Sequence, residues 1–412
     1  MSGIHVTSEI GPLKKVLLHR PGKELLNLTP DTLEELLFDD IPFLEDAMKE
    51  HDAFANVLRE NDVEVVYLED LMTEVLELSD SIKEEFIEQF MEEADIHSYK
   101  ERAYLSRYLN SLNQKELVLK TMEGIRRDSI PELKTEPHPL KNLPKEEFLL
   151  TKPMPNLYFT RDNFASVGVG VDLHKMYSKT RNRECIYSEY IFKYHKDYKD
   201  VPKYYKREYP WHTEGGDLSN LNEHTVMIGI SQRTEKEAIE QLAKNFFENP
   251  KCKIDTVLAI AIPSNRAYMH LDTVFTQIDK YTFTYHPGIL SSLQVLEIKE
   301  GKNPNSKEDL LIEEKNASLD KILEMYLNHP VKLIPCANGD PIASEREQWN
   351  DGSNTLCIAP GVVVVYDRNT ITNNLLRQEG IKVIEIHASE LSRGRGGPRC
   401  MSMPLIREDI LW

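Results

Sequence analysis

The feature that most restricts the fold of this chain is a strand–strand–helix–strand order that recurs along it. Residues 355–386, TLCIAPGVVVVYDRNTITNNLLRQEGIKVIEI, predict two strands around a Pro-Gly turn, then a helix and a third strand. Residues 224–262 repeat the strand–helix–strand part. Polar tetrads that begin at Ser178, Ser231 and Asp367 mark matching exits from strands. Ordinary α/β alternation remains an alternative, but we interpret the pattern as a loosely repeated ββαβ unit.

A helical segment interrupts this alternation. The stretches KKVLLHRPG (14–22) and NDVEVVYL (61–68) supply another α/β unit, whereas residues 72–146 are highly charged and have helical periodicity. Three apolar stripes predict a small bundle: Ile82, Phe86 and Phe90; Leu105, Tyr108, Leu109 and Leu112; Leu117, Thr121, Met122 and Ile125. Ser81 with Glu84 predicts a capping box, and Pro131, Pro137, Pro139 and Pro144 mark its end. We therefore predict an α/β domain of residues 1–71 and 147–412, with a helical insertion at 72–146.

The charge balance and the cysteines exclude several classes of protein. The 412 residues carry a net charge of −18, the opposite of a nucleic-acid-binding surface, and an acidic field attracts small cations. No signal peptide and no run of membrane-spanning length is present, so we expect no membrane partner. The five cysteines form no CxxC motif and no close pair. This spacing favours a reducing cytoplasm over a disulfide framework or a zinc finger.

Four short motifs contain the residue types of a covalent hydrolase. NLYFTRDN holds Asn156, Arg161 and Asp162; HTEGGD holds Glu214 and Asp217; MHLDT holds His270 and Asp272; GRGGPRC ends at Cys400. Taken singly, each fits an ordinary strand end, a turn with positive-φ glycines or a buried cysteine. Together they supply a nucleophile, a base and several carboxylates. The HLD spacing predicts that His270 and Asp272 share one face of a strand.

The charges around these motifs indicate the substrate. Cationic neighbours in the cysteine loop would lower the pKa of the Cys400 thiol and favour the thiolate. Carboxylates that face a substrate select cations, and a pair of them suits the planar fork of a guanidinium. That group is a poor electrophile, so thiolate attack on it requires rigid positioning and a proton donor for the departing nitrogen.

The motifs in this order resemble those of the arginine deiminases. FTRD, EGGD, HLD and a C-terminal cysteine followed by MSMPL carry the resemblance, with HRPG (19–22) and LLFDD (36–40) near the start. The likeness extends over nearly the whole chain, although Asn163 stands where many relatives have proline. It implies a five-fold pseudo-symmetric α/β propeller of ββαβ modules and a homo-oligomer. It also implies hydrolysis of free L-arginine to L-citrulline and ammonia, the first step of arginine catabolism, without a metal or other cofactor.

The resemblance also implies a role for each motif residue. Cys400 would be the nucleophile, His270 the acid and base, and Glu214 the partner of His270 and of the guanidinium. Asp162 and Asp272 would grip the guanidinium nitrogens. The substrate's carboxylate and amine would be bound by three residues: Asn156, Arg181 and Arg233. Phe159 would line the pocket, and Gly394 and Arg395 would belong to a mobile loop over the thiol.

Other functions share part of this inventory. An agmatine or dimethylarginine hydrolase or an amidinotransferase would keep Cys400, His270 and Glu214, but agmatine has no carboxylate for Arg181 and Arg233. A metal hydrolase would lack standard ligand spacing. A papain-like protease would lack its local signature. A non-catalytic arginine sensor would have no need of Cys400 and His270 together.

Overall fold

The computed structural model describes residues 3–135, 148–290, 293–301 and 310–412. Within these ranges, five sheets share one strand pattern. In each, the first two strands pair antiparallel and the second and third pair parallel. The three-strand sets are β19 (Met403–Arg407), β1 (Leu13–Leu18) and β2 (Glu64–Tyr67); β5 (Phe164–Val167), β6 (Gly170–Leu173) and β7 (Lys203–Tyr205); β8 (Leu218–Asn220), β9 (Thr225–Ile230) and β10 (Thr256–Ala261); β11 (Phe275–Asp279), β12 (Thr282–Tyr285) and β15 (Lys332–Pro335); β16 (Leu356–Ala359), β17 (Val362–Tyr366) and β18 (Lys382–Ile386).

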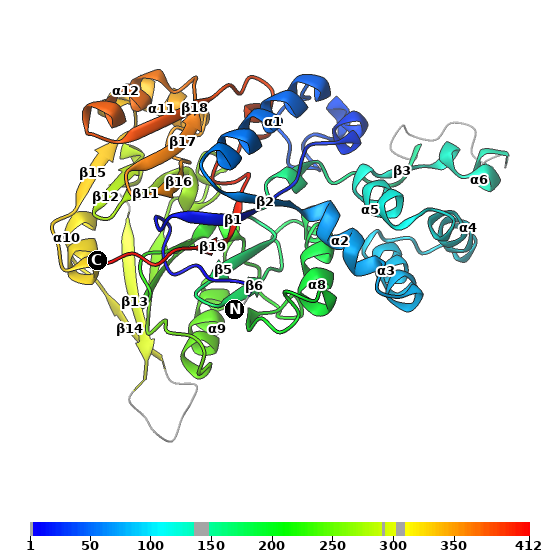
Figure 1. Cartoon of the computed structure of the whole chain (residues 1–412), viewed down its shortest axis with the longest axis horizontal. Coiled ribbons are helices and arrows are strands. Elements are labelled where there is room, and N and C mark those ends of the chain that lie inside the picture. Colours follow the sequence, from blue (N-terminus) through cyan, green and yellow to red (C-terminus); the bar gives the residue numbers. More distant parts are fainter. Residues whose placement is uncertain (1–2, 136–147, 291–292, 302–309) are drawn as a thin grey trace.

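Helices connect the parallel strands, because two parallel strands cannot be joined by a tight turn. The connecting helices are α1 (Leu44–Glu60), α7 (Lys179–Asn182) with α8 (Cys185–Tyr194), α9 (Lys236–Glu248), α10 (Leu319–Leu327) and α12 (Thr370–Gln378). Helices α1, α8, α9, α10 and α12 lie around the outside, with the strands toward the middle (Figure 1).

Further strands and helices extend this pattern. Strands β13 (Gln294–Glu300) and β14 (Leu310–Glu314) lengthen the third sheet, and β3 (Ile125–Arg126) pairs with β4 (Leu149–Thr151). Helix α11 (Pro341–Trp349) precedes the fifth sheet. The remaining helices are α2 (Leu68–Leu76), α3 (Asp80–Glu93), α4 (Tyr99–Asn110), α5 (Gln114–Glu123) and α6 (Pro131–Thr135), which project to one side in Figure 1.

The predicted apolar stripes of the insertion form its core. Phe86, Phe90, Leu105, Leu109, Leu117 and Met122 are at most 1% exposed. Phe86 also contacts Tyr187 and Tyr190 of α8, with ring centroids 6.0 and 5.4 Å apart. The helical segment therefore shares one continuous hydrophobic core with the second sheet.

The N-terminal cap of α3 differs from the one predicted, and the bounds of the insertion are not tested by the structure. The predicted capping box is wrong, because Ser79 caps α3 and accepts a hydrogen bond from the amide of Ile82, while Ser81 lies inside the helix. The division at residues 71/72 and 146/147 stays a prediction. Pro131 begins α6, but Pro137, Pro139, Pro144 and the second boundary lie outside the described residues.

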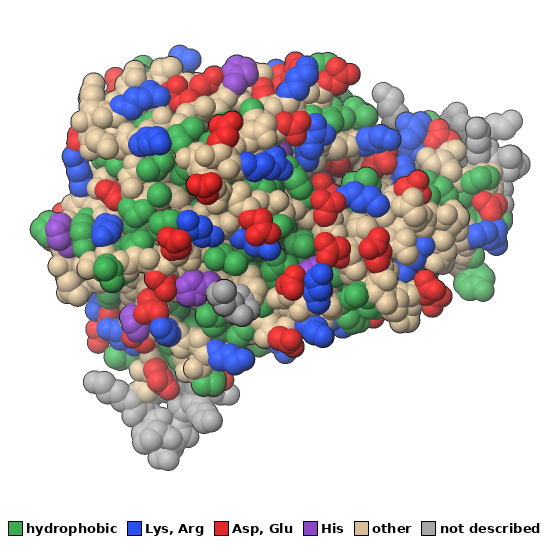
Figure 2. Space-filling view, viewed as in Figure 1, with side chains coloured by type: hydrophobic (Ala, Val, Ile, Leu, Met, Phe, Trp, Pro, Cys, Tyr) green, Lys and Arg blue, Asp and Glu red, His purple; other side chains and the backbone are tan. Residues whose placement is uncertain are grey.

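The surface in Figure 2 mixes acidic and basic side chains, so the negative charge is not gathered into one patch on that face. Among the described residues, no helix combines the length and the apolar character needed to cross a bilayer.

Replacing Phe86 with alanine tests the shared core. Phe86→Ala should lower the free energy of unfolding by about 3–5 kcal/mol, because it leaves a cavity between α3 and α8. Urea unfolding followed by circular dichroism measures the loss. Leu119→Ala on α5, where the side chain is 42% exposed, is the control and should change stability little. A loss below about 1 kcal/mol in Phe86→Ala would contradict a continuous core.

Candidate active site

Equivalent positions in the five sheets converge on one site. In each of the five sheets, a buried carboxylate, amide or thiol side chain stands one to three positions before the first strand. These residues are Asp162, Asp217, Asp272, Asn354 and Cys400. Arg181 and Arg233 follow the second strands of two sheets, where the polar tetrads were predicted, and are also buried. The repeated sequence pattern therefore corresponds to a repeated structure, which brings motifs that are distant in the sequence close together.

The HLD motif adopts a different local structure from the one predicted. His270 precedes a short 3-10 helix at Leu271–Thr273, so it does not share a strand face with Asp272. The reason is local, because the Leu271 amide donates to Asp217 Oδ1 at 2.9 Å and the Thr273 hydroxyl donates back to the His270 carbonyl. Both predicted residues still reach the site from this turn.

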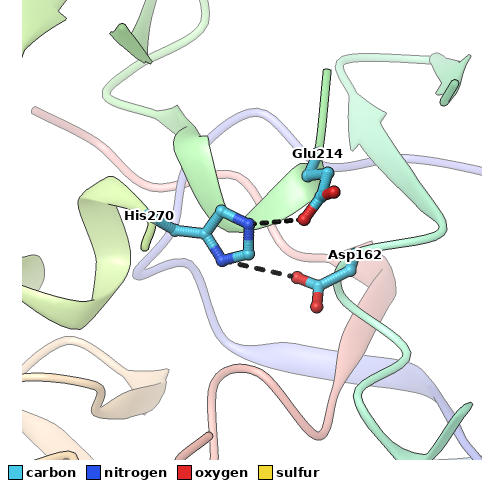
Figure 3. Close-up of side chains that lie close together, drawn as sticks. All are labelled: Asp162, Glu214 and His270. Atoms are coloured by element: carbon cyan, nitrogen blue, oxygen red, sulfur yellow. Dashed lines mark hydrogen bonds and ion pairs between the residues drawn. The ribbon is translucent and has the colours of Figure 1, made fainter. Parts of the chain in front are cut away.

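His270 lies between two carboxylates (Figure 3). Its Nε2 is 2.7 Å from Glu214 Oε2, and its Nδ1 is 3.9 Å from Asp162 Oδ1. Burial alone would lower the pKa of the imidazole, but Asp162, Glu214 and Asp217 raise it to about 9. His270 is therefore a cation at neutral pH and can donate a proton.

Glu214 is held ionised by its neighbours. Its side chain is fully buried, which alone would raise its pKa, but Arg233, His270 and Arg181 bring that pKa well below the usual range. Arg233 Nη1 lies 3.6 Å and Arg181 Nη1 3.9 Å from Glu214 Oε2. Arg181 Nη1 also donates to Asp162 Oδ2 at 3.0 Å. One network thus joins two guanidiniums, two carboxylates and the imidazole.

The same residues satisfy the distance criterion for a metal site. Ligand atoms of Asp162, Glu214 and His270 all lie within 4.8 Å of one another. However, Arg181 and Arg233 already approach these carboxylates, and His270 is protonated. The charge environment therefore opposes a metal cation at this position.

The EGGD glycines serve close approach rather than a positive φ. A Cβ on Gly216 would lie 2.5 Å from His270 Nδ1, and one on Gly215 would lie 2.0 Å from the Arg161 carbonyl oxygen. Neither glycine is among the residues with positive φ. Their missing side chains let the imidazole pack against the turn that holds Glu214.

Cys400 lies in a less cationic environment than its loop suggests. Burial, Asp272 and Asp162 raise the pKa of the thiol well above its usual range, and Arg399 lowers it only in part. Arg399 Nη1 donates to Asp272 Oδ2 at 2.7 Å, and Arg395 stacks on Trp349 with its Cζ 3.4 Å from the ring centroid. The expectation that loop cations alone favour the thiolate is therefore wrong.

Side chains crowd against the loop glycines. A Cβ on Gly394 would lie 1.9 Å from the Tyr158 hydroxyl, and one on Gly396 would lie 2.3 Å from the Phe159 ring. The aromatic pair packs directly under the loop, so these positions require glycine.

A cavity of about 20 Å³ lies beside the thiol, with room for about one water. It is lined by Leu37, Asn156, Phe159, Asp162, Arg181, Arg233, Met269, His270, Thr273, Gly394, Arg395 and Cys400. Asp272 is adjacent, with Oδ2 3.6 Å from the sulfur. The structure therefore brings together all eleven predicted site residues, while Glu214 stands behind His270.

Several residues of this site were missed by the sequence analysis. Leu37 lines the cavity, Arg399 binds Asp272, and Asn354 contacts Cys400. Asn354 was accessible from sequence, because GSNT precedes a strand as HLDT does. Leu37 lies in the LLFDD motif that contributes to the resemblance, but no role was predicted for it. Asn156 does not lie free in the cavity, because its amide donates to the Leu36 carbonyl at 2.7 Å.

Comparisons with known proteins place this site in a family. A family model described as arginine deiminase matches residues 34–407. The arginine deiminase of Treponema denticola is 56% identical over 414 residues, covering 100% of this chain and 100% of that protein. The arginine deiminase of Clostridium perfringens is 50% identical over 411 residues, covering 99% and 98%.

Two solved structures share the fold at low sequence identity. The N-terminal domain of a cyanobacterial arginine dihydrolase, bound to product, has a TM-score of 0.53 at 13% identity, covering 95% of this chain and 97% of that one. A dimethylarginine dimethylaminohydrolase variant, as an adduct with S-methyl-L-thiocitrulline, has a TM-score of 0.52 at 14% identity, covering 95% and 99%. These likenesses confirm the mixed α/β fold.

The protonation of His270 gives a direct test of the site's electrostatics. A selectively ¹⁵N-histidine-labelled sample should show His270 titrating near pH 9, and Glu214→Gln should lower that pKa because it removes a partner of the charged form. His174, whose pKa burial lowers to about 4, is the internal control. The raised pKa of His270 stabilises the folded chain fully below about pH 6.5, and this contribution is lost as the pH rises through about 9. Titration of His270 near pH 6.5 would contradict this electrostatic description.

Proposed function

The chain belongs to the arginine deiminase family and is an enzyme that acts on arginine, and we propose that it hydrolyses free L-arginine to L-citrulline and ammonia through a covalent adduct on Cys400. The supporting observation is that the cavity has both buried acceptors and buried donors that make no hydrogen bond. Asp162 Oδ1 and Asp272 Oδ1 are buried acceptors that accept no hydrogen bond, and Arg233 Nε and Nη1 are buried donors that donate none, although Asp162 Oδ1 and Arg233 Nη1 each take part in a longer ion pair. Carboxylates suit a guanidinium and arginines suit a carboxylate, so together they match a zwitterion with a cationic side chain.

Substrate binding places a positive charge beside the Cys400 thiol. A guanidinium between Asp162 and Asp272 neutralises the two carboxylates that raise the pKa of Cys400. Binding of the cation therefore favours loss of the thiol proton to solvent, which leaves the thiolate beside the electrophilic carbon. The thiol is protected in the empty site and activated in the occupied one.

The reaction then divides into two halves. The sulfur attacks the guanidinium carbon, the bond from that carbon to a terminal nitrogen breaks, and His270 donates the proton with which ammonia leaves. Water next attacks the same carbon while the neutral imidazole takes a proton from it. The carbon–sulfur bond breaks, citrulline leaves, and His270 is charged again. Glu214 holds the imidazole in place throughout.

Arginine cannot enter the closed cavity, so the loop above it has to withdraw. Leu37 and Arg395 both line the cavity and both have positive φ, at 54° and 62°. Such left-handed non-glycine residues store strain in the closed arrangement. Gly394 and Arg395 belong to the segment that would move, and Phe159 forms the floor beneath it.

The alternative substrates fit less well. Agmatine has no carboxylate, so the buried Nε and Nη1 donors of Arg233 would stay without a hydrogen-bond acceptor. Dimethylarginine would place methyl groups near buried carboxylate oxygens, which then lose a donor. A sensor would have no use for a thiol and a protonated imidazole in the same cavity.

The proposal extends to the architecture and the setting. Five sheets with one strand pattern and an outer ring of helices support a five-fold pseudo-symmetric propeller of ββαβ modules with an inserted helical bundle. The five cysteines are free, which supports a reducing cytoplasm. The resemblance supports a homo-oligomer.

Arg233→Leu tests which end of arginine this residue binds. Its KM for arginine should rise about ten- to a hundredfold, because a charge-assisted bond to the carboxylate is worth roughly 1.5–3 kcal/mol. Activity on agmatine should change far less, so the preference for arginine should fall. A citrulline colour assay, with agmatine measured in parallel, gives both values.

Arg59→Leu, on the exposed surface of α1, is the matched control and should leave KM unchanged. A normal KM in Arg233→Leu, or an equal loss with agmatine, would show that the carboxylate is bound elsewhere.

A further inference from the structure

Asn354 makes three hydrogen bonds around the Cys400 thiol. Its Oδ1 accepts from the Cys400 amide at 3.1 Å, and its Nδ2 lies 3.1 Å from the Cys400 sulfur and 3.1 Å from the Asp272 carbonyl oxygen. The side chain is fully buried. Gly397 permits this approach, because a Cβ there would lie 2.8 Å from Asn354 Oδ1. The asparagine and the nucleophile are thus held at two points.

These contacts fix the orientation of the amide. The Cys400 N–H can only donate, so it requires Oδ1 on its side. The Asp272 carbonyl can only accept, so it requires Nδ2 on the other. Rotating the amide by 180° would place two acceptors together and two donors together. An N–H of Asn354 therefore points at the sulfur.

Asn354 differs from the other candidate partners of the sulfur. Arg399 directs its guanidinium to Asp272, Glu9 and the Leu218 carbonyl. Asp272 is itself a carboxylate and repels a thiolate. Among the described residues, Asn354 is the group whose donor is within hydrogen-bonding distance of Sγ. It is also neutral, so it stabilises negative charge on sulfur without repelling a cationic substrate, as a lysine or arginine would.

The position of Asn354 in the fold supports the same conclusion. Asp162, Asp217 and Asp272 hold the equivalent places before β5, β8 and β11. A carboxylate at position 354 would face the sulfur and oppose its ionisation. Asn354 is the one amide in this set and offers an N–H to the sulfur at 3.1 Å, whereas Asp272, 3.6 Å from the same sulfur, offers a carboxylate.

We propose that Asn354 is a catalytic residue, whose side-chain N–H binds and stabilises the Cys400 thiolate before attack and again when that thiolate departs. This inference rests on the proposed function of Cys400. In the first half, the sulfur lone pair becomes the carbon–sulfur bond and the hydrogen bond weakens. In the second half, the bond breaks, the pair returns to sulfur, and the hydrogen bond strengthens again.

Two variants at this position test the proposal. Asn354→Asp keeps the size and the acceptor for the Cys400 amide but removes the donor, and should lower kcat by a hundredfold or more. Asn354→Ala should lower it ten- to a hundredfold. The KM for arginine should stay within about threefold in both. The pH profile of Cys400 alkylation by iodoacetamide, mapped by peptide mass spectrometry, should move upward by at least one pH unit.

Asn369→Ala is the matched control. Asn369 is also a buried asparagine, and its amide donates to the Asn350 carbonyl at 2.8 Å. This variant should keep the wild-type kcat and alkylation profile. A wild-type kcat in folded Asn354→Asp would overturn the proposal, as would an unshifted alkylation profile. Failure of both Asn354 variants to fold would assign a structural role and overturn it too. If Cys400→Ala is inactive while the Asn354 variants keep the wild-type kcat, this inference is wrong but the proposed function stands. Full activity in Cys400→Ala would contradict the proposed function as well.

Discussion

The site depends on a buried carboxylate, Glu214, that stays ionised in the interior. Its charge is balanced by His270, Arg181 and Arg233, which come from three separate connections of the fold. Removing one partner of such a network leaves an uncompensated buried charge, which costs several kcal/mol. The network therefore sets the positions of its members more strictly than apolar packing would. It also keeps the imidazole protonated, as the first half of the proposed reaction requires.

Much of this arrangement follows from the sequence. The polar tetrads at the strand exits contain Arg181 and Arg233, whose role was implied by the resemblance, and the four motifs contained Cys400, His270 and the carboxylates. The HLD turn could not be predicted from residue spacing, because its shape comes from Asp217, a residue 54 positions away, accepting the Leu271 amide. The capping residue of α3 was misplaced by two positions, since Ser79 and Ser81 are both suitable caps and only the geometry distinguishes them.

The electrostatics of the thiol could not be deduced from local sequence. The arginines of the GRGGPRC loop suggest a positive environment, yet Arg399 and Arg395 face other partners. Burial raises the pKa of the Cys400 thiol most, and carboxylates from distant motifs, Asp272 and Asp162, raise it further. The empty site thus keeps the Cys400 thiol protonated, and in the proposed reaction a bound guanidinium provides the missing positive charge. Specificity and activation then have the same physical origin.

Quenched-flow mass spectrometry during turnover tests the covalent step most directly. With arginine as substrate, acid-quenched samples should show the mass of arginine less ammonia on the peptide that contains Cys400. If the loss of His270 slows the attack of water more than it slows the departure of ammonia, His270→Ala should accumulate this adduct. Cys400→Ala should bind arginine but show neither adduct nor turnover. An adduct on Cys185, Cys252, Cys336 or Cys357, or full activity in Cys400→Ala, would contradict the account.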